Sequence, residues 1–270
     1  MISPPPIQQL YLEAPAPGDL PVICLHGWGM NLRVFDSIRE VMEHADTKTG
    51  AVDLPGHGRS PWNSKRREFA QQLQDVLSVL PPRCVLLGWS LGGQFALEIA
   101  RVAPWRVAGL VLFATTPRFG KSPDWEHGLD PLALQAFRDT LNWDWEQTLA
   151  DFVWLQLRGS RHAEQAQQQI RAALEKHGLP NRQALEAGLS ILAANDLRRH
   201  IPTLTHPALL LAGQNDRITP PGAMRFMHEQ MPRSRYLQID RAGHAPFLSH
   251  TEECAQPLRD FLHDVAEQVR

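Results

Sequence analysis

The feature that most constrains the fold is a serine set among glycines where an apolar run changes into a helical pattern. Gly88-Trp89-Ser90-Leu91-Gly92-Gly93 follows the apolar run 84–88 and opens the helical pattern 91–102. Such a junction is typical of a sharp strand-to-helix turn, because larger side chains at the flanking positions would collide with the strand and helix. The turn would raise the Ser90 hydroxyl above a sheet, at a helix N-terminus that favours developing negative charge. The alternative is a glycine-rich connection without chemistry.

Apolar runs separated by helical patterns predict an α/β protein with a mostly parallel central sheet flanked by helices. Beside the run before Ser90, we expect strands at 22–25, 107–114, 208–212 and 236–239.

The stretch 117–199 interrupts this alternation with consecutive amphipathic helical patterns. We expect helices at 130–141, 145–157, 163–175 and 181–194. A helical block between two α/β halves is expected to cover the carboxyl edge of the sheet, where open α/β sheets bind ligands. The sequence therefore predicts a core built from 1–116 and 200–270, with an inserted helical cap at 117–199.

Composition excludes several classes of function. The formal net charge of −2 gives no basic excess to attract nucleic acid. No apolar run approaches the roughly 20 residues of a membrane span. Residues 1–6 lack a charged segment followed by an apolar one, so they do not resemble a secretory signal. We therefore predict a cytoplasmic monomer that binds neither nucleic acid nor membrane.

The sequence also offers no metal or cofactor site. Cys24, Cys84 and Cys254 lie far apart and lack CxxC spacing, which argues against both a disulfide framework and a zinc site. Cys24 and Cys84 lie in apolar runs and are expected to be small buried hydrophobic residues. No phosphate-binding loop or dinucleotide fingerprint is present, so we predict no metal and no cofactor.

A serine hydroxyl is a weak nucleophile and needs a general base. His244 is the candidate, because it follows the predicted strand 236–239 in a loop that would bring it to the carboxyl edge of the sheet. Asp216 follows the strand 208–212 and would fix the imidazole tautomer. Its alternative role is a helix N-cap before Thr219-Pro220-Pro221. Most other histidines are expected to be solvated or packed at the surface: His57, His127, His162, His177, His200, His206, His228, His250 and His263.

A tetrahedral intermediate requires two N–H donors. One is expected from the backbone of Leu91, the residue after the nucleophile. The other is expected from Trp28 in Leu25-His26-Gly27-Trp28-Gly29, where glycines allow the backbone N–H to turn inward. His26 is expected to brace this loop. The segment 53–60, Asp-Leu-Pro-Gly-His-Gly-Arg-Ser, is interpreted as a structural turn.

Together these segments resemble the α/β-hydrolase superfamily. The sequence is similar in particular to the BioH family, the pimeloyl-[acyl-carrier protein] methyl ester esterases of biotin synthesis. The resemblance extends over nearly the whole chain. Its further parts are Ala114-Thr115-Thr116-Pro117, the segments 188–192 and 196–198, and the histidine loop 242–250.

The resemblance implies a serine carboxylesterase that releases methanol from a pimeloyl methyl ester carried on acyl-carrier protein, a transient partner. It implies a Ser90–Asp216–His244 triad. It also implies substrate contacts at Trp28, Ser90, Leu91, His244 and the run Phe152-Val153-Trp154-Leu155-Gln156. We expect Trp89, Leu91, Phe152 and Trp154 to line an apolar channel; Phe152 and Trp154 are explained equally well as cap core.

One departure from the family concerns the carrier-docking surface. The family presents basic residues there, whereas this chain has Glu146, Gln147 and Asp151 just before Phe152. A differently placed basic face could come from Arg138, Arg158, Arg161 and Arg171.

Three other readings are weighed. A general short-chain carboxylesterase acting on free esters would share every catalytic residue. Dehalogenases and epoxide hydrolases of this fold are disfavoured, because they carry an aspartate where Ser90 stands. A catalytically silent binding module is disfavoured by the intact serine, aspartate and histidine.

Overall fold

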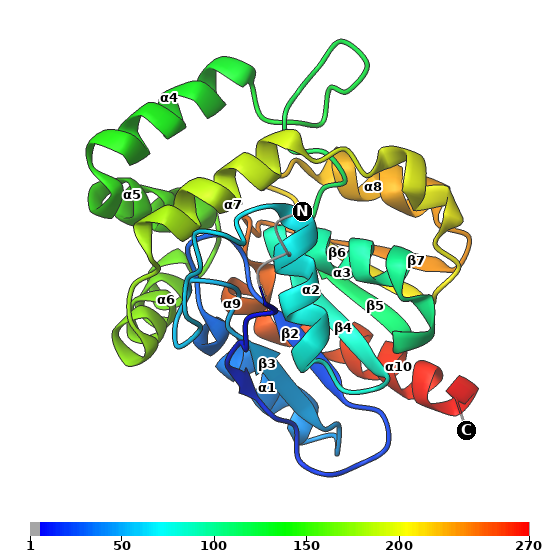
Figure 1. Ribbon diagram of the computed structural model, residues 1–270. Coiled ribbons are helices and arrows are strands. Elements are labelled where there is room, and N and C mark those ends of the chain that lie inside the picture. The colour runs from blue at the N-terminus through cyan, green and yellow to red at the C-terminus, as the bar shows by residue number, and fades with distance from the viewer. Residues whose placement is uncertain (1–5, 270) are drawn as a thin grey trace.

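The computed structural model describes residues 6–269 and shows a seven-stranded sheet between two layers of helices (Figure 1). The strand order is β1-β3-β2-β4-β5-β6-β7; β1 runs antiparallel to β3, and every other neighbouring pair is parallel. The strands are β1 (Leu12–Glu13), β2 (Val22–Leu25), β3 (Thr49–Val52), β4 (Cys84–Trp89), β5 (Val107–Phe113), β6 (Ala208–Gly213) and β7 (Ser234–Ile239). The mostly parallel sheet expected from the sequence is confirmed.

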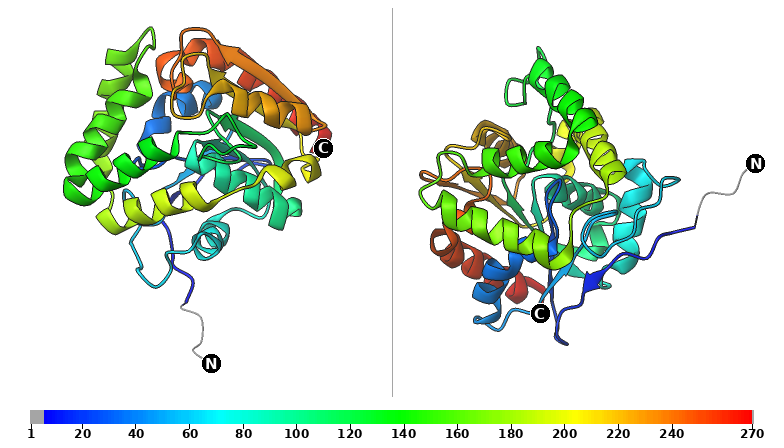
Figure 2. Two further views of the ribbon diagram at one scale, coloured as in Figure 1. Left: turned by 90° about the horizontal axis from the view of Figure 1, so that it is seen from above. Right: turned by 90° about the vertical axis from the view of Figure 1, so that its left-hand side faces the viewer.

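Helices cover both faces of the sheet. Helices α2, α3 and α8 lie on one face, and α1 and α10 lie on the other (Figures 1 and 2). The core helices are α1 (Asp36–Glu43), α2 (Phe69–Val79), α3 (Leu91–Val102), α8 (Pro221–Gln230), α9 (Pro246–Ser249) and α10 (Thr251–Val269). Short 3-10 helices span Leu32–Phe35, Pro104–Arg106 and Arg198–Thr203. None of the helices in the described range is both long and apolar enough to cross a bilayer.

Four helices fill the stretch between β5 and β6, and we call them the cap helices. They are α4 (Pro131–Trp143), α5 (Trp145–Leu157), α6 (Ala163–His177) and α7 (Arg182–Ala194). Three of these helices have an N-cap side chain at or next to the expected first residue. Asp130 accepts from the Leu132 N–H at 2.8 Å, Asp144 from Gln147 at 3.0 Å, and Asn181 from Gln183 at 2.9 Å. In Figure 1 the cap helices lie above and beside the sheet.

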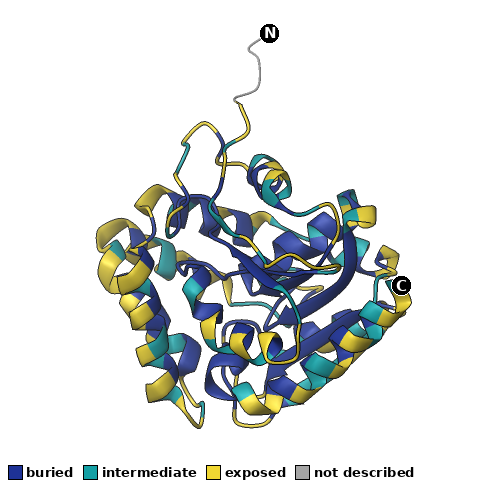
Figure 3. Cartoon of the chain, turned by 90° about the horizontal axis from the view of Figure 1, so that it is seen from below, coloured by how far each residue is buried: buried dark blue, intermediate teal, exposed yellow. Residues whose placement is uncertain are grey.

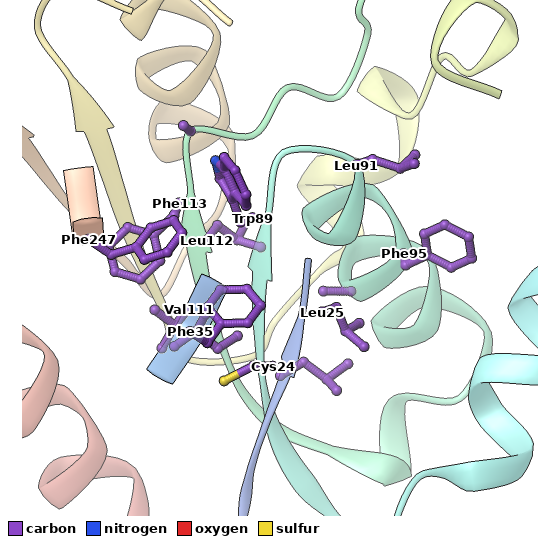
Figure 4. Packing of buried hydrophobic residues seen from close by; sticks show 14 of the residues in the cluster. Cys24, Leu25, Phe35, Trp89, Leu91, Phe95, Val111, Leu112, Phe113 and Phe247 are labelled. Carbon is purple, nitrogen blue, oxygen red and sulfur yellow. The ribbon is translucent and has the colours of Figure 1, made fainter. Parts of the chain in front are cut away.

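The core is centred on the middle strands, which are buried along their whole length (Figure 3). Trp89, Phe113 and Phe35 meet Phe247 on one side of the sheet, and Phe95 packs on the other (Figure 4). Burial on both faces explains why these strands are continuous apolar runs rather than alternating ones.

Several elements have no strong signal in the sequence. Strands β1 and β3 are short, and β3 includes a glycine, so neither stands out as an apolar run. Cys24 and Cys84 are free and buried, as expected, and Cys254 is also free and buried. Most of the N-terminal run on which the leader prediction rests (residues 1–5) lies outside the described residues.

Candidate active site

Ser90 occupies a strained turn between β4 and α3. Its backbone has φ 55° and ψ −116°, a conformation that L-residues rarely adopt. Glycines surround it because the backbone passes too close for a side chain. A Cβ at Gly92 would lie 2.0 Å from the Leu25 carbonyl oxygen, and one at Gly93 would lie 1.9 Å from Thr115 Oγ1. The local geometry is therefore the sharp strand-to-helix turn that the sequence predicts.

Asp216 and His244 meet at the carboxyl ends of β6 and β7. His244 Nδ1 lies 2.8 Å from Asp216 Oδ2, and both side chains are buried. Since a carboxylate only accepts, Nδ1 carries the proton and Nε2 is the free basic nitrogen. His244 Nε2 is buried and has no hydrogen-bond partner within the described chain. The pair therefore leaves one imidazole nitrogen available for a proton transfer.

The carboxylate of Asp216 is held by its own turn. Its Oδ1 accepts from the backbone N–H groups of Ile218 at 2.8 Å and Thr219 at 2.9 Å. Thr219 Oγ1 lies 2.8 Å from Asp216 Oδ2 and 2.9 Å from the Ala114 carbonyl oxygen. Asp216 is thus a partner of the histidine and closes its own turn, whereas the N-cap of α8 is Pro220, which has no side-chain cap. Thr219 is a site residue that the sequence analysis did not identify.

Trp89 connects the strand-to-helix turn at Ser90 (the serine elbow) to the histidine loop, residues 242–250. Its indole Nε1 donates to the His244 carbonyl oxygen at 2.8 Å, and its ring lies 5.8 Å from the imidazole. Trp89 is fully buried, and Phe247 packs edge-on against it, with the ring centroids 5.1 Å apart (Figure 4). The ring therefore supports the histidine loop. Because it exposes no surface, it does not line the channel that the sequence analysis expects.

Two backbone N–H groups stand free beside the serine. Within the described chain, the N–H groups of Trp28 and Leu91 donate to no protein acceptor. Gly29 has φ 74°, a left-handed conformation that glycine adopts freely. At Gly27, a Cβ would lie 3.3 Å from Ser90 Cβ, so this loop passes directly over the serine. The two N–H groups that the sequence analysis selected therefore have no acceptor among the described residues.

The cap helices bring aromatic side chains over the Trp28 loop. The Trp28 ring lies 5.3 Å from Phe137 of α4 and 5.0 Å from Phe152 of α5, both edge-on. Its Nε1 donates to the Leu185 carbonyl oxygen of α7 at 2.8 Å. Phe137 is partly buried and packs against Trp28 and Phe152, but a single phenylalanine in an amphipathic pattern gave no reason to select it.

The run 152–156 is divided between the interior and the surface. Phe152, Val153 and Gln156 are buried, and Leu155 is partly buried. Trp154 is 53% exposed and packs against the Arg158 guanidinium, 5.2 Å from the ring centroid. The structure therefore does not bring Trp154 together with Phe152. Gln156 Nε2 is buried without a partner among the described residues.

The expectation of a surface position is wrong for His57, His177 and His250, all of which are buried. His57 Nδ1 donates to the Pro55 carbonyl oxygen at 3.0 Å, and its Nε2 accepts from the Gly29 N–H at 3.3 Å. His177 of α6 lies 3.2 Å from Asp53 Oδ2 and so attaches the cap to the core. These residues sit in loops or at helix ends, where no hydrophobic periodicity reveals burial.

His26 braces the loop that carries Trp28. Its Nδ1 donates to the Gly27 carbonyl oxygen at 2.8 Å, and its Nε2 accepts from the Leu54 N–H at 2.9 Å. Burial lowers the pKa of His26 to about 4 and that of His57 to about 3. Both imidazoles are therefore neutral supports whose two nitrogens are already used, which excludes them as the base.

Two buried cysteines lie in the central strands. Burial raises the pKa of the Cys24 and Cys84 thiols to about 12, so neither is a thiolate nucleophile. Among residues 6–269 there is no group of three or more histidine, cysteine, aspartate or glutamate side chains arranged to hold a metal.

Comparison with known proteins agrees with this geometry. The profile of the family described as alpha/beta hydrolase fold matches residues 21–251. The chain is 37% identical to a pimeloyl-[acyl-carrier protein] methyl ester esterase of Nitrosospira multiformis, over 90% of this chain and 94% of that protein. It is 38% identical to the protein of the same name from Stenotrophomonas maltophilia, over 89% and 92%.

Solved structures show the same fold. An esterase from Exiguobacterium antarcticum superposes with a TM-score of 0.84 at 23% identity, covering 94% of this chain and 95% of that one. The chain belongs to the α/β-hydrolase family and, within it, to the family of the pimeloyl-[acyl-carrier protein] methyl ester esterases.

Proposed function

We propose that this protein is a serine carboxylesterase that hydrolyses the methyl ester of pimeloyl-[acyl-carrier protein]. The observation that carries the chemistry is the pairing of a strained serine elbow, φ 55° at Ser90, with a buried aspartate–histidine pair 2.8 Å apart. The relatives' shared activity supports the choice of substrate. In this proposal Ser90, Asp216 and His244 form the triad.

The first half-reaction transfers the acyl group to the serine. Ser90 Oγ attacks the ester carbonyl carbon while His244 Nε2 takes the hydroxyl proton. The oxyanion that forms is stabilised by the N–H groups of Trp28 and Leu91. Asp216 stabilises the imidazolium through Nδ1. Collapse of the intermediate breaks the carbonyl–methoxy bond, and His244 gives its proton to the departing methoxide, so methanol leaves.

The second half-reaction releases the acid. A water molecule gives a proton to His244 Nε2 and attacks the acyl-enzyme carbonyl. The second oxyanion occupies the same two N–H donors. Its collapse breaks the bond between the acyl carbon and Ser90 Oγ, His244 returns its proton to Oγ, and the pimeloyl chain leaves as the free acid, which ionises to the carboxylate.

The aromatic contacts around Trp28 favour a slim aliphatic acyl chain. Phe137 and Phe152 place apolar rings on the cap side of the oxyanion loop. Each buried methylene contributes about 0.8 kcal/mol of binding energy. Of the substrate contacts proposed, Trp28, Leu91, Phe152, Val153, Leu155 and Gln156 come from buried or partly buried positions. Trp89 contributes by supporting His244, and Trp154 lies with Arg158 on the outer face.

A general short-chain carboxylesterase is the second candidate. It is favoured by the acidic and polar residues at the start of α5, Glu146, Gln147 and Asp151, which do not suit an acidic carrier protein. Arg158, Arg161 and Arg171 are exposed and offer another basic face.

The deciding experiment is mass spectrometry of methyl pimeloyl-carrier protein before and after incubation with the enzyme. The proposal predicts that the carrier-bound chain loses the mass of one CH2 group, because hydrolysis replaces the methyl group by hydrogen, with methanol released in equal amount. The Ser90→Ala variant is the control and should leave the substrate intact. Unchanged carrier-bound ester, together with rapid hydrolysis of free methyl esters, would select the general carboxylesterase.

A further inference from the structure

The turn between α5 and α6 contacts the loops that carry the proposed acid and base. This turn, residues 156–161, belongs to the cap stretch, yet it lies against residues 241–244 and Asn215 of the core. The Gln156 carbonyl oxygen accepts from the His244 backbone N–H at 2.8 Å, and the Arg161 N–H donates to the Arg241 carbonyl oxygen at 3.1 Å. Asn215 Nδ2 donates to the Gly159 carbonyl oxygen at 2.9 Å.

A single side chain of the turn binds the histidine loop. Ser160 Oγ accepts from the Gly243 backbone N–H at 2.8 Å, directly before His244. The approach is so close that a Cβ at Gly243 would lie 2.8 Å from Ser160 Oγ and 2.7 Å from the Gln156 carbonyl oxygen. The glycine before the histidine is therefore required by the neighbouring cap turn.

The turn is shaped to make these contacts. Gly159 has φ 83°, and the Ser160 N–H donates back to the Leu157 carbonyl oxygen at 3.0 Å. Arg241, on the opposing loop, has φ 55°. Two backbone segments in left-handed turns thus meet at Ser160 and Gly243. Backbone hydrogen bonds at 156 and 161 hold His244 of the histidine loop and Arg241 just before that loop. The Gly243 N–H between them is bound by the Ser160 hydroxyl instead.

We propose that Ser160 is a positioning residue through which the cap aligns the catalytic histidine. The base must keep Nδ1 on Asp216 while Nε2 faces the serine, and its backbone direction decides whether both are met. Ser160 and Gln156 set that direction from the cap. A shift of the α5–α6 turn would therefore change the alignment of His244, coupling the position of the cap to the readiness of the triad.

The test is the rate of Ser90 labelling by a small fluorophosphonate, measured for wild type, Ser160→Ala, Ser160→Thr and Ser190→Ala. Ser190 is the matched control, because its hydroxyl donates to the Glu186 carbonyl oxygen within cap helix α7, at 2.9 Å, and touches neither catalytic loop. Labelling is followed to completion. The endpoint then counts correctly folded sites, and the rate constant reports alignment of the base.

We expect Ser160→Ala to label roughly fivefold more slowly, the factor for losing one neutral hydrogen bond of about 1 kcal/mol at 1.36 kcal/mol per tenfold. Its kcat for a small free ester should fall by a similar factor with little change in KM. Ser160→Thr, which keeps the hydroxyl, should return to within about twofold of wild type. Ser190→Ala should match wild type.

The proposal is overturned if Ser160→Ala labels as fast as Ser190→Ala, or if the threonine variant is as slow as the alanine variant. A variant that folds poorly lowers the endpoint and not the rate constant, so a folding defect is recognised separately. The inference rests on the proposed triad. If wild type itself fails to label at Ser90, the proposed function fails, and that outcome is distinct from equal rates in the labelled variants.

Discussion

At the residue scale, the proposed nucleophile stands in a backbone conformation that only a supporting structure maintains. Ser90 has φ 55°, and its strain is held by strand β4 on one side and helix α3 on the other. Removing the hydroxyl changes none of those supports. The chemistry at this position can therefore be separated from the fold.

Replacing Ser90 with alanine should lower kcat by about 10⁴- to 10⁶-fold, because the members of a serine triad act as a unit. The melting temperature should stay close to that of wild type, since the hydrogen bonds of Ser90 within the described chain are made by its backbone and not by its hydroxyl. Steady-state hydrolysis of a chromogenic ester and thermal denaturation are the measurements. Retention of more than a tenth of wild-type activity would refute the assignment of Ser90.

The buried histidines His26 and His57, in and beside the loop that carries Trp28, predict a dependence of stability on pH. His26 and His57 are neutral in the folded protein, with pKa values lowered to about 4 and about 3 by burial. In the unfolded chain each titrates near about 6.5. Below that value the unfolded state binds more protons than the folded state, so stability falls as pH drops from about 6.5 toward the folded pKa values. At pH 5 the loss should be about 2 kcal/mol for each histidine.

Denaturant unfolding at several pH values tests this dependence. His57→Gln keeps one donor and one acceptor for the Pro55 carbonyl and the Gly29 N–H but cannot titrate. The slope of unfolding free energy against pH between 5 and 6 should be smaller in the variant by about one proton. Identical slopes in both proteins would show that His57 is not held neutral.

At the element scale, the junction of β4 and α3 allows no additional atoms. Gly92→Ala would place a methyl group 2.0 Å from the Leu25 carbonyl oxygen and 2.6 Å from that of His26, and both contacts are backbone. We expect a loss of about 3 kcal/mol or more in stability, with esterase activity lost as the elbow shifts.

Gly120→Ala is the matched substitution. A Cβ there would meet nothing within 4 Å, and Gly120 is not among the glycines with positive φ. Its stability should stay the same or rise by about 0.4–1 kcal/mol, because alanine reduces the freedom of the unfolded chain. Chemical denaturation of both variants provides the comparison. Equal stabilities would mean that helix α3 can move away from strand β2 at little cost.

At the scale of the whole molecule, the carrier-bound and free substrates should respond differently to salt. A carrier protein would contact exposed charges on the cap, whose attraction is screened as the Debye length falls from about 10 Å at 0.1 M to about 3 Å at 1 M. We expect kcat/KM for the carrier-bound ester to fall with salt and that for a small free ester to change little. Paired salt titrations on both esters measure this difference.

Charge-reversal variants identify which arginines of the cap contact the carrier protein. Arg138→Glu, Arg158→Glu and Arg161→Glu should impair only the carrier-bound reaction. Arg83→Glu is the control, because Arg83 is exposed just before β4, at the sheet edge opposite Ser90. If the two esters respond alike in every variant, and the carrier-bound ester is no better a substrate, the general-carboxylesterase reading replaces the proposal.

The elements around the site follow from local sequence. Burial of a strand on both faces requires an unbroken apolar run, and a sharp turn after it requires glycine. Cys84–Trp89 followed by Leu91–Val102 satisfies both conditions, and the structure has both elements there. Helix α5 likewise starts and ends as its pattern predicts, Trp145–Leu157. The order of strands along the chain was enough to select Asp216 and His244 from their positions after β6 and β7.

Which side chains meet was decided only by tertiary packing. Phe152 and Trp154 are two positions apart on α5, so they point about 160° away from each other around the helix axis, and only one can face the interior. Docking of α5 beside Trp28 turned Phe152 inward and left Trp154 outside. Burial of His57 and the bond from Ser160 to Gly243 join segments distant in sequence. A sequence pattern carries the period of one element, whereas these contacts depend on how separate elements are oriented against each other.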